Sequence, residues 1–180
     1  MPSHLKPPVG DQDHIQGTDD AVIELVEYGD YECPHCGAAY PVIKKIEKKF
    51  GTQIRFIFRN FPLTESHEHA MAAAIASEAA ALQHKFWEMH DIIFENQRSL
   101  SEAGLLKLAG SIGLDVEPFK KDITKENLQE KVESDFESGI RSGVNATPTF
   151  FINGEKYNDG WESDRMLKFI RANGIGTVDH

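Results

Sequence analysis

The stretch Glu27-Tyr-Gly-Asp-Tyr-Glu-Cys-Pro-His-Cys36 contains both cysteines of the 180-residue chain. Two cysteines placed at random in a chain of this length would stand three positions apart in roughly one chain in ninety, which favours a functional pair. A single bridge between neighbours on a turn closes almost no loop, so a stabilising disulfide framework is excluded. The spacing therefore indicates chemistry at Cys33 and Cys36.

A strand precedes the cysteines and a helix begins between them. Residues 21–28 are a nearly continuous apolar run rich in β-branched residues, which predicts a strand covered on both faces of a partly parallel sheet. Over residues 34–50 apolar side chains recur every four positions with lysines opposite, which predicts a helix. Pro34 suits its first turn, Pro41 should kink it and Gly51 should end it.

The rest of the chain predicts a second strand, a block of helices, a hairpin and a closing helix. The hairpin is indicated by Asn153-Gly154, a dipeptide that favours a two-residue turn. The acidic positions of the last helix in the block are expected to form a solvated face. The expected elements are a strand over 53–60, helices over 69–83, 85–97, 101–109, 117–119 and 125–141, strands over 149–152 and 155–157, and a helix over 163–172, ended by Asn173-Gly174.

Composition and charge exclude several classes of protein. With 19 Lys and Arg against 29 Asp and Glu, the net charge of −10 leaves no basic footprint for nucleic acid or an anionic membrane. An apolar content of 40% is typical of a globular domain, and no stretch is long enough for membrane insertion. Residues 1–14 lack the features of a secretory leader, so a cytoplasmic protein is expected. The alternative is a periplasmic or otherwise extracytoplasmic protein whose leader has been removed.

The position of each cysteine predicts its role. Cys33 lies where the helix begins, next to unpaired backbone N–H groups that favour a thiolate, the nucleophilic form of cysteine. His35 can add a hydrogen-bond donor or a positive charge. Cys36 lies one turn further in and should be more buried, which suits it to attack a mixed disulfide formed at Cys33.

Metal binding is the main competing interpretation of such a pair. A zinc site needs two further ligands, and His67 and His69 point to different sides of a helix, where capping or surface roles are expected. An iron–sulfur cluster needs four thiolates and therefore a dimer. We expect no metal; an inert pair is the remaining alternative.

The sequence resembles the DsbA-like thiol–disulfide oxidoreductases, a branch of the thioredoxin superfamily, over about residues 17–172. The tetrapeptide at residues 33–36 is identical to that of the DsbA type, and Pro41, Thr147-Pro148-Thr149 and the run from Phe58 to Leu63 match as well. The resemblance implies an α/β thioredoxin fold with an inserted helical domain. The implied organisation is a polar N-terminal arm over 1–20, a thioredoxin-like core over 21–61 and 144–175, and a helical insertion over 62–143.

Three further site residues follow from this resemblance. It implies that Pro148 is a cis proline beside the cysteines, holding the Thr147 backbone as a docking edge for a substrate chain. A trans proline that merely begins the next strand is the alternative. Glu27 corresponds to a buried acid that accepts the proton of Cys36, although an acidic residue at a sheet edge could instead face solvent.

The function that the resemblance implies is disulfide exchange with protein or peptide thiols. The Cys33–Cys36 disulfide itself would carry the electrons, with Pro34, His35 and Glu27 in support and no metal or organic cofactor. The direction is open, because Pro-His between the cysteines resembles oxidising members whereas an absent leader suggests a reducing compartment. Two alternatives are a glutathione-dependent transferase or isomerase on this scaffold and a non-catalytic, chaperone-like binding protein.

Overall fold

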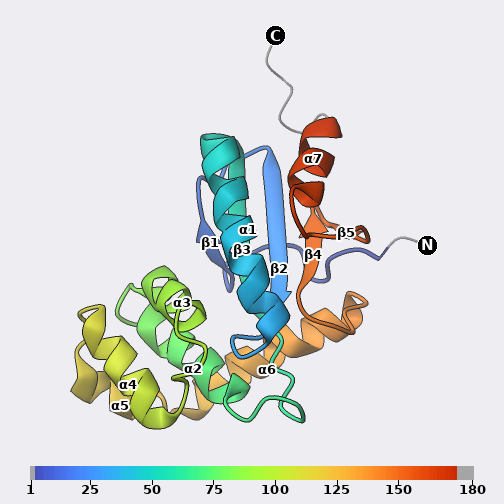
Figure 1. The fold of residues 1–180 in the computed structure, drawn as a ribbon. Coiled ribbons are helices and arrows are strands. Elements are labelled where there is room, and N and C mark those ends of the chain that lie inside the picture. The colour runs from blue at the N-terminus through green and yellow to red at the C-terminus, as the bar shows by residue number, and fades with distance from the viewer. Residues whose placement is uncertain (1–2, 174–180) are drawn as a thin grey trace.

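The computed structural model describes residues 3–173, which form one mixed sheet with helices on one face and at one end (Figure 1). The strands lie in the order β1-β3-β2-β4-β5. They are β1 (His14–Gln16), β2 (Ile23–Gly29), β3 (Ile54–Asn60), β4 (Thr149–Ile152) and β5 (Glu155–Tyr157). The helices are α1 (Pro34–Phe50), α2 (Ala70–Ala81), α3 (Phe86–Phe94), α4 (Glu102–Ser111), α5 (Val116–Asp122), α6 (Glu126–Arg141) and α7 (Arg165–Ala172), with a 3-10 turn at Gly51–Gln53.

Strand β2 is central, and its pairing determines which side chains face α1. It runs parallel to β3 and antiparallel to β4, with Glu27 opposite Phe58 on one side and Phe150 on the other. Successive side chains of a strand point to opposite faces. Leu25 and Glu27 therefore share the face covered by α1, while Val26 packs in the cluster on the other face.

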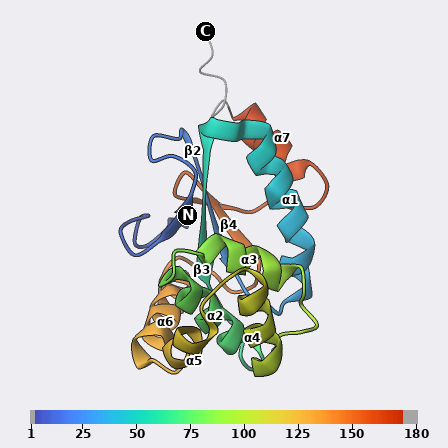
Figure 2. The ribbon, with the colours of Figure 1, turned by 90° about the vertical axis from the view of Figure 1, so that its left-hand side faces the viewer.

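The layers around the sheet position the cysteine stretch at a junction. Helices α1 and α7 cover one face, and the N-terminal segment lies on the other (Figure 2). Helices α2–α6 gather at the carboxyl end of β2, the same end at which α1 begins (Figure 1). The chain that links β2 to α1 therefore lies between the sheet and the helical block. None of the helices in residues 3–173 is both long and apolar enough to span a membrane.

Helix α1 has the predicted bounds. Pro34 occupies its first turn, and Cys33 is the extended residue before it, with φ −69° and ψ 124°. Gly51 ends the helix with a positive φ of 54°, a conformation that glycine adopts at little cost. The helix continues across Pro41, so the kink predicted there does not interrupt it.

The N-terminal arm predicted over 1–20 includes an edge strand that the sequence analysis missed. Strand β1 pairs antiparallel with β3, and Leu5 is buried with Val26 in the cluster on the face of the sheet opposite α1. A three-residue strand with half-buried side chains carries too little alternation to be recognised from sequence. At the other terminus, residues 174–175, which include the predicted helix-ending Gly174 and close the predicted core, lie outside the described residues.

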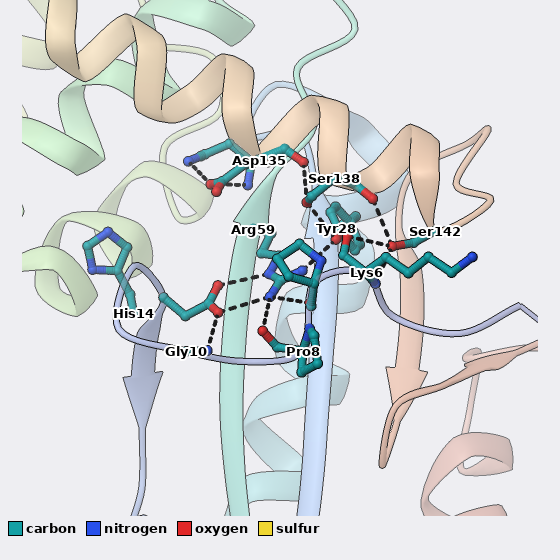
Figure 3. Close-up of polar contacts among 12 residues, drawn as sticks. Lys6, Pro8, Gly10, His14, Tyr28, Arg59, Asp135, Ser138 and Ser142 are labelled. Atoms are coloured by element: carbon teal, nitrogen blue, oxygen red, sulfur yellow. Dashed lines mark hydrogen bonds and ion pairs between the residues drawn. The ribbon is translucent and has the colours of Figure 1, made fainter.

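Arg59 fixes this segment to the sheet (Figure 3). Its guanidinium donates to both carboxylate oxygens of Asp13, at 2.8 and 2.9 Å, and to the Tyr28 hydroxyl at 2.8 Å. It also donates to the carbonyl oxygens of Pro7 and Pro8. Because a buried guanidinium is costly unless its donors are paired, these contacts hold the segment tightly.

Candidate active site

The two cysteines lie where β2 ends and α1 begins, and both are free thiols. Cys33 retains 4% of its surface exposed and Cys36 none, so Cys33 alone is open to attack from outside. This order of exposure is the one expected from their positions in the helix.

The environment of Cys33 favours its thiolate. A hydrogen bond from the Cys36 thiol is the largest contribution, and it outweighs the opposing effect of burial. The Thr147 side chain and the backbone N–H groups of His35 and Cys36 act in the same direction, and together they lower the pKa of Cys33 to about 5. A thiol with this pKa is almost fully ionised near neutral pH, which is the form that attacks disulfides.

Cys36 has the opposite character, and Glu27 contributes to it. Burial raises the pKa of Cys36 well above its usual value, and the hydrogen bond to Cys33 and the charge of Glu27 add to this rise. Its sulfur accepts a hydrogen bond from the backbone N–H of Asp30 at 3.4 Å. Cys36 therefore holds its proton until a base removes it.

Glu27 is buried in the central strand, with 2% of its surface exposed, and does not lie at a solvent-facing edge. Burial and the Cys33 charge raise the pKa of its carboxyl to about 8. One carboxylate oxygen has no hydrogen-bond partner among the described residues, and it lies 2.7 Å from where a side chain on Gly29 would begin. Glu27 is thus a buried acid that exchanges protons near neutral pH, the range required of a general base.

The Thr147–Pro148 peptide bond is cis, as the resemblance implies. The Cys33 thiol lies 3.8 Å from the Thr147 carbonyl oxygen and donates to it. The Thr147 hydroxyl is buried and makes no hydrogen bond within residues 3–173 while Cys33 is a thiol, so its effect on the pKa of Cys33 belongs to the thiolate form. The hydroxyl is therefore free to turn toward the Cys33 sulfur when that sulfur carries charge.

His35 and Pro34 form the exposed rim of the site. Both side chains are open to solvent in the first turn of α1. His35 acts on Cys33 as a hydrogen-bond donor through its backbone N–H. The expected role of the imidazole itself stays a prediction.

Asp30 organises the connection between β2 and α1, and sequence reasoning missed it. Its carbonyl oxygen accepts from the Cys33 N–H at 3.1 Å, and its carboxylate accepts from the Glu32 N–H at 2.8 Å. The same carboxylate is paired with His67, which comes from the loop after β3. The only sequence cue was a short polar residue directly after Gly29, which is too common to be specific.

Gln97 links the helical block to the reactive cysteine, and it was also missed. Its side-chain amide donates to the carbonyl oxygens of Tyr31 and Cys33, each at 2.9 Å. A side chain on Gly37 would collide with Gln97, so the glycine leaves the space that this amide fills. The two residues are distant in sequence, and no local pattern connects them.

Replacing Gln97 by alanine is expected to destabilise the folded protein at the cysteine site. The variant loses two partly buried hydrogen bonds, which should lower the free energy of unfolding by about 1–3 kcal/mol. Urea denaturation of the reduced protein measures this, with Gln129→Ala as the control, because Gln129 is exposed on α6 and bonds only Glu133. Equal stabilities of the two variants would show that the Gln97 contacts contribute nothing.

No group of three or more His, Cys, Asp or Glu side chains in the described part of the chain is arranged to hold a metal ion. His67 pairs with Asp30, whereas the His69 ring lies 3.9 Å from the exposed Glu68. The two histidines therefore have different neighbours.

A cysteine with a lowered pKa and a second cysteine with a raised pKa thus stand together at the start of a helix, where the sheet meets the helical block. The family described as thioredoxin matches residues 10–172, and the chain belongs to that family.

Solved structures agree with this assignment. BdbD from Bacillus subtilis, in its oxidised form, is 28% identical, with a TM-score of 0.82 and coverage of 94% of this chain and 97% of that chain. The α-DsbA1 protein of Wolbachia pipientis is 23% identical, with a TM-score of 0.78 and coverage of 96% and 94%. At that lower identity the likeness shows the fold alone. The fold is thus the predicted α/β thioredoxin fold with inserted helices.

Curated relatives are longer proteins. An Na(+)/H(+) antiporter NhaA 1 of Mycolicibacterium vanbaalenii is 38% identical over 170 residues, which are 93% of this chain and 28% of the relative. The NhaA 1 protein of Salinispora arenicola is 36% identical over 167 residues, or 26% of its length. The chain therefore spans about a quarter of the length of these relatives.

Proposed function

We propose that this protein exchanges disulfides with protein or peptide thiols through Cys33 and Cys36. The observation that carries the proposal is the contrast between the two thiols, one with a pKa lowered to about 5 and the other with a pKa well above the usual value. The ionised thiol, which retains a little exposed surface, attacks, and the protonated, fully buried thiol resolves the product. Opposite shifts in the pKa values of the two thiols are not expected of a cysteine pair without chemical function.

In the reducing direction the Cys33 thiolate attacks one sulfur of a substrate disulfide. A bond forms between Cys33 and that sulfur, while the other substrate sulfur leaves as a thiolate. In the mixed disulfide Cys33 no longer carries the charge that adds to the raised pKa of Glu27, so Glu27 loses its proton to solvent more readily. The Glu27 carboxylate then accepts the proton of Cys36, and the Cys36 thiolate attacks the Cys33 sulfur. The Cys33–Cys36 disulfide forms, the second substrate sulfur leaves, and two electrons have passed to the substrate.

We further propose that the oxidising direction is favoured. Each interaction that stabilises the Cys33 thiolate stabilises the dithiol form over the disulfide form, because the disulfide has no charge to stabilise. The disulfide form of such a protein gives up its bond readily to substrate thiols. The exchange needs no metal or organic cofactor, since the cysteine pair carries the electrons.

Replacing Cys36 by serine tests the division of roles. The variant keeps the attacking thiolate but has no resolving thiol, so we expect mixed disulfides to accumulate at Cys33. Incubation with a peptide disulfide followed by intact-mass spectrometry without reductant should show a covalent adduct for Cys36→Ser and only traces for the wild type. Failure to form the adduct, with the Cys33 thiolate still present, would contradict the proposed roles.

The same experiment, repeated with oxidised glutathione in place of the peptide disulfide, tests the glutathione-dependent alternative. A transferase or isomerase on this scaffold would bind glutathione selectively, whereas the proposed exchange also accepts disulfides of unrelated peptides.

Antiport, the activity named for the NhaA relatives, is not proposed, because the matched segment is about a quarter of those proteins and forms a thioredoxin fold.

A further inference from the structure

Asp30, the residue whose backbone binds both cysteines, also carries a buried carboxylate. The Asp30 side chain has 0% of its surface exposed. Its backbone N–H donates to the Cys36 sulfur at 3.4 Å, and its carbonyl oxygen accepts from the Cys33 N–H at 3.1 Å. A fixed negative charge at this place opposes ionisation of Cys33, because like charges in a poorly solvated site repel strongly.

Within residues 3–173 the carboxylate is held by three groups, of which one can carry a positive charge. The backbone N–H groups of Glu32 and Leu63 donate to it at 2.8 and 2.9 Å. The His67 Nδ1 atom lies 2.8 Å from Oδ2. The imidazole keeps 20% of its side-chain surface exposed, so it can exchange a proton with solvent while it stays in contact with Asp30.

We propose that protonated His67 is a positioning residue of the active site, which compensates the buried charge of Asp30 and thereby favours the Cys33 thiolate in the reduced protein. His67 acts through Asp30 and through its charge, and it needs no contact with the substrate. The thiolate and the imidazolium are coupled, so that each stabilises the other.

The electrostatics of His67 support this coupling. Burial disfavours its charged form, but the hydrogen bond to Asp30 and the charges of Asp30, Cys33 and Glu32 outweigh burial and raise its pKa. Coupling between two sites is reciprocal, so a thiolate that favours the imidazolium is favoured by it to the same extent. In the disulfide form Cys33 has no charge and this contribution disappears.

The charged groups around His67 are the following. Asp30, Glu32 and Cys33 face it from the connection between β2 and α1. Its own segment carries the exposed Glu65 and Glu68. The ring of His69, two positions after His67, lies near Glu68. His69 is therefore a histidine of the same segment whose acidic neighbour is not Asp30.

The main experiment measures ionisation of Cys33 by absorbance at 240 nm across pH in the reduced wild type and in His67→Gln. Glutamine can still donate to Asp30 but carries no charge. We expect the pKa of Cys33 to rise by about half to one unit, which is a three- to tenfold decrease of its acid dissociation constant. The equilibrium with glutathione should move toward the disulfide form by the same factor, and tenfold corresponds to about 30 mV.

Two further variants separate charge from structure. In the double variant Asp30→Asn, His67→Gln both charges are absent, so the pKa of Cys33 should return close to the wild-type value. A merely structural role predicts that the double variant is disturbed at least as much as the single one. His69→Gln is the matched control and should leave the titration unchanged.

A measurement on the wild type decides the matter even if a variant does not fold. NMR titration of the His67 ring should give a higher pKa in the reduced than in the disulfide form. Equal values in the two forms, or an unchanged Cys33 titration in folded His67→Gln, would overturn the proposal. The inference rests on the proposed exchange chemistry, but these titrations use no substrate. A protein that failed to exchange disulfides could still show the coupling, so the two failures are distinguishable.

Discussion

Replacing Cys33 by serine should reduce catalysed disulfide exchange to the background rate, a loss of about a thousandfold or more. The serine hydroxyl stays protonated in the environment that ionises Cys33, because its pKa is far above that of a thiol. It also has no sulfur with which to form the mixed disulfide. Turbidity from insulin reduced by dithiothreitol measures the loss.

The matched control for this experiment is Ala38→Ser. Ala38 is exposed on the first turns of the same helix, so the control adds a hydroxyl to α1 without touching either thiol. It should keep wild-type turnover. Full activity of the Cys33→Ser variant would contradict the proposed function, because Cys36 is then the one cysteine left in the chain.

Glu27 should make the reduced protein less stable as pH rises. Its folded pKa of about 8 stands above the usual 4.5, so between these values the folded state binds a proton that the unfolded state has lost. The contribution is fully present below about pH 4.5 and is lost as pH rises through about 8. The shift corresponds to about 5 kcal/mol.

The measurement compares urea denaturation of reduced wild type and Glu27→Gln from about pH 5 to about pH 8. Cys33 titrates in the opposite sense in both proteins, because its folded pKa is lowered and stability rises with pH through its range. The difference between the two curves therefore reports Glu27 together with its coupling to Cys33, and it should move in favour of the variant by several kcal/mol. Glu130→Gln, at an exposed position of α6, should give no such change. Parallel curves for wild type and Glu27→Gln would contradict a buried, protonated carboxyl.

Local sequence was sufficient for the elements that carry the cysteines. Helix α1 begins at Pro34 and ends at Phe50 as predicted, because a proline in the first turn and a glycine after the last are local determinants. The Asn153-Gly154 turn likewise joins β4 and β5, with Ile152 opposite Glu155. Such features depend on a few neighbouring residues.

Features that depend on contacts between distant residues were not readable. The burial of Glu27 depends on β3 and β4 pairing on either side of it, so the strand sequence alone left a solvent-facing edge open and only the resemblance implied a buried acid. Gln97 and His67 meet the cysteine stretch only because the helical block folds back onto the end of the sheet. The edge strand β1 depends on β3 for its hydrogen bonds, and its own three residues give little indication of it.

The anchoring of the N-terminal segment by Arg59 also determines how this domain transmits force. Arg59 belongs to β3 and bonds Tyr28 of the central strand, so a pull on the segment passes directly to the middle of the sheet. Residues 7–13 are therefore held to the centre of the sheet, and a load applied to them reaches the strand that leads into Cys33.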